Sequence, residues 1–283
     1  MNVYKQGFLT LITIFSLVLL PVSGMAQDDV GTAEAAVTDK SDKSGTNPIN
    51  FQRDFRIYNE YLWLNTEGDG NQNLTTLEYR QPFAGGKWQF RIRAPYSMLK
   101  ADLNGDGIDD IDDDGLGDVN FRLMTVPWMK GANAFAFALE VFLDTASEDS
   151  LGAGATSLAP IVFYGHFFGG GWGPWKKGGL FAPGLQYKFS IDEDDGRDDV
   201  EQIIIDINYL LMSVDGKSWL FAEPQIVFDQ ENNTEFAIMD IEFGFMTSRK
   251  GQSWYLRPTF TLGSSSDRPT DYGLEIGYKW VGW

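Results

Sequence analysis

Apolar and polar residues alternate with a period of two along most of the chain from residue 51 onward. In the stretch 88–94, Trp88, Phe90 and Ile92 fall on one side of an extended chain, while Arg91 and Arg93 fall on the other. Successive side chains of a β-strand point to opposite faces, so this alternation predicts strands with one apolar and one polar face. The pattern recurs in 135–143, 203–211, 237–245 and 274–280.

We divide this region into twelve predicted strands, most of them close to the ~9–11 residues that a tilted strand needs to cross a bilayer. They are 54–65, 73–83, 87–99, 118–127, 134–144, 158–168, 180–191, 200–212, 219–229, 235–247, 253–263 and 271–282. A closed sheet can present such one-sided apolar strands to lipid, so we predict an all-β fold, a single antiparallel transmembrane β-barrel over residues 51–283. A soluble β-sandwich remains the alternative.

The connectors between the predicted strands alternate between two kinds. One kind is short and basic or neutral, and comprises 84–87, 128–133, 169–179, 213–218 and 249–252. The other is more acidic, and comprises 66–72, 100–114, 145–157, 192–199, 230–234 and 264–271. Nearly all of the net charge of −18 therefore lies at one end of the predicted barrel. An even number of strands places both termini at the short-turn end, which is the periplasmic side of an outer-membrane barrel, and the acidic loops outside the cell.

Tryptophans follow the same division. All except Trp63 lie at or beside the short connectors or the C-terminus. Tryptophan favours the membrane–water boundary because its ring is apolar and its N–H needs a polar partner. The distribution predicts an aromatic girdle at the periplasmic end.

The N-terminus carries the pattern of an export signal. Lys5 precedes the apolar run 8–20, and small residues stand at Gly24 and Ala26. We interpret residues 1–26 as a signal peptide cleaved after Ala26, because the run is shorter than the ~20 residues of a membrane-spanning helix. Residues 27–50 contain almost no large apolar side chain, which predicts a flexible periplasmic arm, with a short plug inside the barrel as the alternative. The predicted location is the bacterial outer membrane, with membrane lipid and, during insertion, the barrel assembly machinery as partners.

The composition and the single histidine limit the partners and the catalytic mechanisms that this chain can have. The strong negative charge makes nucleic acid an improbable partner, and the absence of cysteine excludes Cys–His catalysis and disulfides. His166 has no serine within two residues, and its parity places it on the inward face. A barrel lipid hydrolase is thus a weaker alternative, and carboxylates such as Asp240 and Glu242 are more typical of structural ion pairs than of acid–base catalysis. We predict no enzyme activity, no catalytic residue and no catalytic cofactor.

Parity places sixteen charged residues on the inward face, half acidic and half basic. They are Arg56, Glu60, Glu78, Arg80, Arg91, Arg93, Arg122, Glu140, Lys188, Asp206, Glu223, Asp240, Glu242, Arg257, Glu275 and Lys279. Such charges either pack the interior as ion pairs or line a polar pore, and twelve strands fall between small filled barrels and open porins. We expect a narrow, selective or partly obstructed channel for small solutes. A non-transporting structural or adhesive surface barrel is the alternative, because acidic loops also suit partner binding.

One segment carries a resemblance to a known family. Residues 115–123 (Gly-Leu-Gly-Asp-Val-Asn-Phe-Arg-Leu) are followed by a strand that ends at 144–145 and a glycine-rich segment, 150–160, that ends in Pro160. This region resembles the outer-membrane proteins named for the meta-pathway of phenol degradation, with Asp-Thr-Ala at 144–146 in place of their Pro-Thr-Gly. The resemblance implies a barrel that transports small solutes, aromatic or hydrophobic compounds among them.

The acidic connector 100–114 contains the spacing of a calcium loop. Oxygen donors fall at positions 1, 3, 5, 9 and 12 of a twelve-residue loop, with glycine at position 6 and a backbone carbonyl at position 7. The corresponding residues are Asp102, Asn104, Asp106, Asp110 and Asp113, with Gly107 and Ile108. The spacing resembles the loops of EF-hand-like and thrombospondin type 3 repeats and predicts a structural Ca²⁺ ion. A solvated acidic loop is the alternative.

Overall fold

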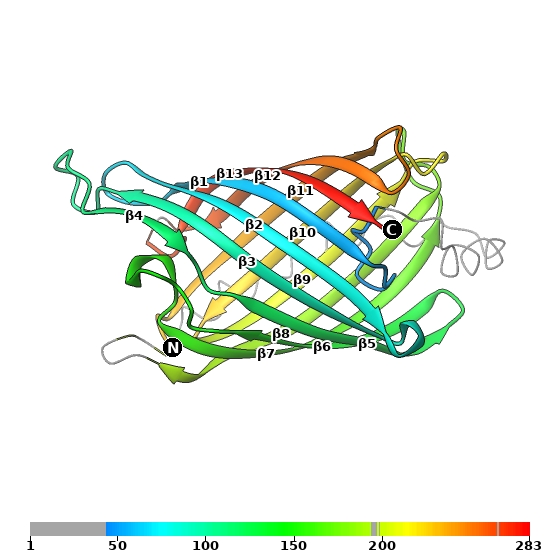
Figure 1. The fold of residues 1–283 in the computed structure, drawn as a ribbon, viewed down its shortest axis with the longest axis horizontal. Coiled ribbons are helices and arrows are strands. Elements are labelled where there is room, and N and C mark those ends of the chain that lie inside the picture. Colours follow the sequence, from blue (N-terminus) through cyan, green and yellow to red (C-terminus); the bar gives the residue numbers. More distant parts are fainter. Residues whose placement is uncertain (1–43, 194–196, 198, 265) are drawn as a thin grey trace, which may run out of the picture.

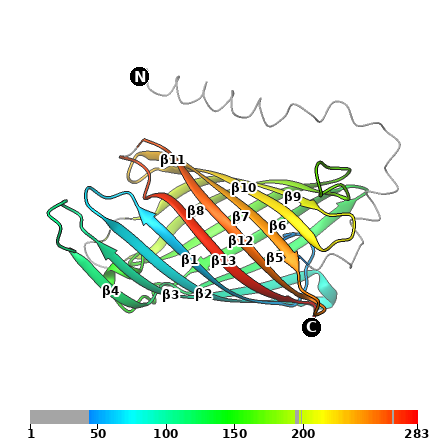
Figure 2. The same ribbon diagram turned by 90° about the horizontal axis from the view of Figure 1, so that it is seen from above.

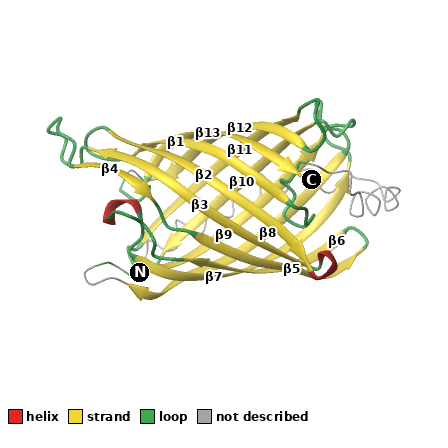
Figure 3. Cartoon of the chain, in the orientation of Figure 1, coloured by secondary structure: helices red, strands yellow, loops and turns green. Residues whose placement is uncertain are grey.

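The computed structural model describes residues 44–193, 197, 199–264 and 266–283. The predicted signal peptide and residues 27–43 of the predicted arm lie outside these ranges. Nearly all of the described chain is strand, with two short 3-10 helices, η2 (Ala84–Gly86) and η3 (Asp149–Leu151) (Figure 3). None of the helices among the described residues is long and apolar enough to cross a membrane.

Twelve of the observed strands coincide, within three residues at each end, with the strands predicted from the alternation. In chain order the strands are β1 (Asp54–Leu64), β2 (Gly70–Phe83), β3 (Trp88–Ala101), β4 (Ile111–Leu116), β5 (Asn120–Lys130), β6 (Asn133–Phe142), β7 (Ala155–Gly169), β8 (Gly178–Glu193), β9 (Glu201–Met212), β10 (Ser218–Asp229), β11 (Thr234–Met246), β12 (Gln252–Gly263) and β13 (Thr270–Val281).

Antiparallel pairing runs from strand to strand around a closed ring. β1 pairs with both β2 and β13, so that Asp54 lies opposite Arg80 on one side and Val281 on the other. β3 completes the wall between β2 and β5. The prediction of an all-β, twelve-stranded antiparallel barrel is therefore confirmed (Figures 1 and 2). Ring closure satisfies the backbone groups of the first and last strands, which an open sheet would leave exposed.

β4 is the strand that the sequence did not predict. β3 pairs with β5 over Trp88–Arg93 and with β4 over Tyr96–Ala101, so β4 extends the wall at the long-connector end (Figure 1). The interpretation of 100–114 as a loop was wrong for its last residues. Their Ile-Asp-Asp-Asp sequence has little strand propensity, and cross-strand contacts such as Lys100 Nζ to Asp112 Oδ2, 2.9 Å, join it to β3.

The outward face of the barrel is apolar. Leu139 on β6, Leu185 on β8 and Ile276 on β13 are 44%, 50% and 52% exposed, whereas their inward neighbours Ala138 and Glu275 are buried. In a soluble sandwich the apolar faces would meet in a core between two sheets, but here they face away from the single closed wall. A barrel with this outer surface fits a membrane and leaves the sandwich interpretation without support.

The tryptophans at the short-turn end divide into two groups. Trp88, Trp128, Trp254 and Trp280 are exposed on the outer face, as expected for a girdle. Trp219 is fully buried instead, and its inclusion in the predicted girdle was wrong. Its ring lies flat against the inner wall because Gly244 leaves room for it; a Cβ at Gly244 would come within 1.9 Å of the indole.

Candidate functional site

The barrel interior is built from the inward positions of the strands, and it contains all sixteen charged residues that parity places there. Eight of them are buried: Arg56, Glu78, Arg80, Arg91, Glu140, Glu242, Glu275 and Lys279. Lys188 lies on the same inward face of β8 as Leu180 and Ala182, with its ammonium 4.3 Å from the centre of the Phe142 ring. Asp206 on β9 lies opposite Gln225 on β10, and Arg122 on β5 lies between Arg91 and Glu140.

Glu78 is the centre of one ion-pair network, on β1–β3. Its Oε1 lies 2.5 Å from Arg80 Nε and 3.3 Å from Arg56 Nε, and its Oε2 lies 2.5 Å from Arg93 Nε. Asp54 also pairs with Arg56. Next to this network, Arg91 on β3 pairs with Glu140 on β6. A buried carboxylate shared by three guanidinium groups is compensated for its desolvation by charge-assisted hydrogen bonds.

Glu242 is the centre of a second network, on β10–β13. Its carboxylate accepts hydrogen bonds from Lys279 Nζ at 2.7 Å, Arg257 Nη2 at 2.6 Å and Trp219 Nε1 at 2.6 Å. Lys279 and Glu242 both have no exposed surface in their side chains. Four strands are thereby joined inside the barrel at the short-turn end.

Residues 44–50 lie inside the barrel rather than in an arm outside it. Thr46 Oγ1 donates to Glu242 Oε1 at 2.9 Å and accepts from Lys279 Nζ at 2.8 Å, and the Gly45 carbonyl accepts from Arg56 and Arg80. Ile49 is buried against Leu180, Trp219 and other inward apolar residues. This segment is at the same end of the barrel as the C-terminus (Figure 1).

The predicted flexible arm is thus wrong for residues 44–50. The prediction rested on the scarcity of large apolar side chains, but the segment is held mainly by polar contacts of its backbone and Thr46, with one apolar anchor at Ile49. Residues 44–50 instead fit the alternative prediction, a short plug inside the barrel. We name them the luminal segment.

The interior has an apolar wall as well as a charged one. Buried Met124, Ala136, Ile161 and Phe163 form one cluster on β5–β7, and Phe167, Leu180, Leu210 and Phe221 belong to a second that extends to β10. This wall was not predicted from the sequence, because the prediction considered only charged inward residues. The signal was present in strands such as 133–142, where Ala134, Ala136 and Ala138 alternate with larger apolar residues and both faces are apolar.

A central cavity of about 320 Å³ remains between the networks. Eight of the sixteen predicted residues line it: Arg56, Glu60, Glu78, Arg93, Glu223, Asp240, Arg257 and Glu275. Tyr58, Thr76, Asn120, Gln225 and Tyr255 line it too. These polar residues have the same inward parity as their charged neighbours, so the sequence could have identified them. A cavity of this size holds several water molecules.

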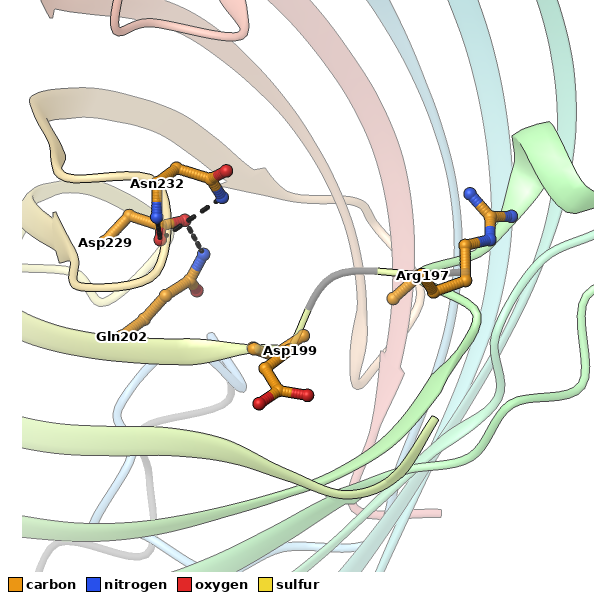
Figure 4. Close-up of a pocket in the computed structure, with 7 residues that line it drawn as sticks. Arg197, Asp199, Gln202, Asp229 and Asn232 are labelled. Carbon is orange, nitrogen blue, oxygen red and sulfur yellow. Dashed lines mark hydrogen bonds between the residues drawn. The ribbon is translucent and has the colours of Figure 1, made fainter. Parts of the chain in front are cut away.

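A second cavity, of about 300 Å³, lies at the long-connector end and is lined by Arg197, Asp199, Gln202, Asp229 and Asn232 among others (Figure 4). Asp229 accepts hydrogen bonds from Gln202 Nε2 at 3.0 Å and from the backbone and side chain of Asn232 at 3.0 and 3.3 Å. Its carboxylate therefore stabilises the β10–β11 turn.

His166 lies on the outward face, and its predicted inward orientation was wrong. The inward positions of β7 are Ile161, Phe163 and Phe167, so His166 shares the face of Tyr164. Its Nδ1 lies 2.8 Å from Asn133 Oδ1, to which Tyr164 also donates. The imidazole is thus in contact with the side-chain amide of Asn133. Among the hydrogen bonds of the described residues, none joins His166 to a nucleophile of the kind that a hydrolase uses.

The first part of the predicted calcium loop forms a turn around Asp102, but Asp113, the residue at the last loop position, lies outside this turn. Asp102 accepts hydrogen bonds from the backbone N–H of Gly105 and Gly107, both at 2.8 Å, and these bonds lower the pKa of its carboxyl. Asp113 instead lies on β4 and accepts from Ser150 Oγ at 2.6 Å. Within the described ranges, no group of three or more His, Cys, Asp or Glu side chains is arranged to hold a metal ion. The Ca²⁺ ion stays a prediction from sequence spacing.

No family model and no curated protein matches this sequence. Among solved structures, the chain is similar to the COG4313 outer membrane channel from Pseudomonas putida F1, with a TM-score of 0.63 and 10% identity over 82% of this chain and 95% of that one. It is also similar to the NanC porin, with a TM-score of 0.51 and 11% identity over 81% of this chain and 98% of that one. At these identities the likeness is one of fold, and the fold is that of outer-membrane barrels.

Proposed function

We propose that this chain is a channel of the bacterial outer membrane that passes small solutes through a partly obstructed lumen. The observation that carries the proposal is the polar central cavity, enclosed by a wall whose outer face is apolar. A barrel needed only as a rigid surface could fill its interior completely. This one keeps a cavity that can hold water and is lined by charged and hydroxyl groups.

The proposed solutes are small compounds, aromatic or hydrophobic ones among them. Support comes from the resemblance of residues 115–160 to the phenol meta-pathway proteins and from the apolar wall of β5–β10. Rings and alkyl groups gain by leaving water for such a wall, while the charged wall keeps the remaining space hydrated. The chain then acts without catalysis.

The proposed orientation follows from the connectors. Short turns and the C-terminus lie at one end and face the periplasm, and the acidic loops with the β3–β4 extension face outside. The barrel would be surrounded by outer-membrane lipid and inserted by the barrel assembly machinery. On this orientation the luminal segment narrows the periplasmic end.

Planar bilayers test the channel directly. Purified protein, shown to be folded by its heat-dependent mobility in electrophoresis, is expected to produce discrete conductance steps. A folded barrel that stays silent would contradict the channel and favour a structural or adhesive role for the acidic loops.

The solute class needs a separate measurement. Liposomes that contain the protein are expected to admit a small aromatic alcohol faster than a sugar, relative to protein-free liposomes that correct for diffusion through lipid. Equal protein-dependent rates for both solutes would retain the channel and reject the aromatic preference.

A further inference from the structure

The charges around the central cavity are not balanced. Among its lining residues, Glu60, Glu78, Glu223, Asp240 and Glu275 are acidic, while Arg56, Arg93 and Arg257 are basic. The lining thus has two more acidic than basic residues. Charges inside a barrel need a partner or water, so an excess of one sign affects which ions can enter.

All three arginines of the lining are already engaged. Arg56 pairs with Asp54 and Glu78, and Arg93 pairs with Glu78. Arg257 donates to Glu242 at 2.6 Å, which leaves it 3.9 Å from Glu223 and 4.0 Å from Glu275. Glu78 and Glu242, which lie deeper among these cations, therefore take most of the positive charge.

The remaining carboxylates face each other across neighbouring strands. Glu60 on β1 lies directly opposite Glu275 on β13, and Glu223 on β10 lies directly opposite Asp240 on β11. Like charges in these positions destabilise a sheet. Glu60 and Asp240 form no ion pair with another described residue, although Thr259 Oγ1 donates to Asp240 at 2.5 Å. Two like-charged pairs thus border one cavity with too few cations.

Unpaired polar atoms lie in the same region. Asn120 Oδ1, in the lining, and Asp206 Oδ1, on the neighbouring β9, are buried acceptors with no hydrogen-bond donor. Arg257 Nε and Asn208 Nδ2 are buried donors without an acceptor, so this region contains unpaired donors as well as unpaired acceptors. Arg80, Arg91 and Arg122 carry positive charge elsewhere in the lumen but do not line this cavity.

From this placement we propose that the central cavity selects for cations: a monovalent inorganic or small ammonium ion is stabilised between the Glu60–Glu275 pair and the Glu223–Asp240 pair. The attraction of a cation to carboxylates in a narrow, poorly screened lumen is larger than in water, and a chloride ion is repelled by the same groups. Glu60 and Asp240 are the residues that determine this selectivity. The inference rests on the proposed channel function and names the charge class that the channel prefers.

Reversal potentials across a KCl gradient measure the selectivity. Both sides are held at ~1 M salt or above, where the screening length is about 3 Å and the acidic loops contribute little. The unmodified protein is expected to prefer K⁺ over Cl⁻. The double variant Glu60→Gln with Asp240→Asn keeps side-chain shape and removes both charges, and its permeability ratio is expected to fall by about twofold or more.

The control variant removes two charges outside the cavity. Glu148 and Glu231 are exposed in the long connectors, and Glu148→Gln with Glu231→Gln should leave the ratio unchanged at high salt. Arg122→Gln removes a cation from the lumen and should not reduce the preference for K⁺.

The outcomes separate the two proposals. No conductance from the folded, unmodified protein rejects the channel and the selectivity with it. Conductance without preference for K⁺, or a preference that the Glu60–Asp240 double variant retains, rejects the selectivity alone. An equal loss in the loop variant would assign the preference to the connectors and also overturn the inference.

Discussion

At the scale of single residues, Glu242 shows how this barrel accommodates buried charge. Its carboxylate is shared by Lys279, Arg257 and Trp219, and it also holds Thr46 of the luminal segment. The desolvation of a buried pair consumes much of its Coulomb energy, so the network contributes mainly by fixing which groups meet. Removal of one member destabilises the fold by more than the intact pair stabilises it, because the remaining charged partner stays buried.

We expect Glu242→Gln to destabilise the folded barrel by about 3–5 kcal/mol, because fully buried Lys279 loses its carboxylate partner. Urea unfolding in detergent, followed by tryptophan fluorescence, measures the change. The matched control is Glu231→Gln, at an exposed connector position, for which we expect little effect. Equal stability of the two variants would show that the network does not support the fold.

Asp102 leads to a prediction about pH. Hydrogen bonds from the N–H groups of Gly107 and Gly105 hold the pKa of its carboxyl below the usual 3.8. Because the folded pKa is the lower one, the carboxylate stabilises the turn above pH 3.8, and that stabilisation is lost as pH falls through the folded pKa. Amide protection at Gly105 and Gly107, measured by NMR in micelles, should persist from neutral pH to about 4 and then decline. Asp102→Asn should remove this pH dependence; protection that falls well above pH 4 in the unmodified chain would contradict it.

At the scale of elements, the luminal segment and the strands are stabilised differently. Each strand of the closed ring is held by two neighbours, whereas residues 44–50 make a few contacts to side chains that point inward. The segment can therefore be removed without breaking a strand pair.

Deletion of residues 44–50 is expected to raise single-channel conductance, because the short-turn end of the lumen loses Thr46 and Ile49. The measurement uses planar bilayers with identical salt on both sides. Thr46→Val with Ile49→Asp is a milder variant that removes the two anchors and should raise the frequency of the larger conductance. Unchanged conductance in both variants would show that ions bypass the segment.

At the scale of the whole molecule, the barrel places apolar side chains outside and charges inside, the reverse of a soluble protein. Lipid takes the place of a protein core at the outer positions. Apolar substitutions there are tolerated, whereas charged substitutions destabilise the barrel more strongly the nearer they lie to the bilayer midplane.

A charge on the outer face tests the membrane assignment. Leu139→Arg, at an outward position of β6, is expected to cost about 2–4 kcal/mol if it lies near the bilayer midplane. Leu103→Arg, at a similarly exposed position in the 100–114 connector, should cost much less. Unfolding of both variants from lipid bilayers gives the comparison, and equal costs would indicate that β6 does not face lipid.

The sequence by itself determined twelve of the strands, their alternating faces and the ends at which the connectors lie. Alternation with a period of two is a local property, and inward parity correctly predicted that Glu78 and Glu242 face the lumen. It gave no reliable answer for His166, because both faces of its strand carry apolar residues. Trp219 was assigned to the girdle by its position at the short-turn end, although it shares the inward parity of Glu223.

Only the tertiary structure decided which of the inward charges meet. Glu78 gathers Arg56, Arg80 and Arg93 from three strands, while Glu60 is placed against another carboxylate, and both outcomes depend on ring closure and strand register. The position of residues 44–50 in the lumen also depends on ring closure and strand register. A polar segment has no apolar face to mark its destination, and its binding site exists only once strands far apart in the chain have brought Glu242 and Lys279 together.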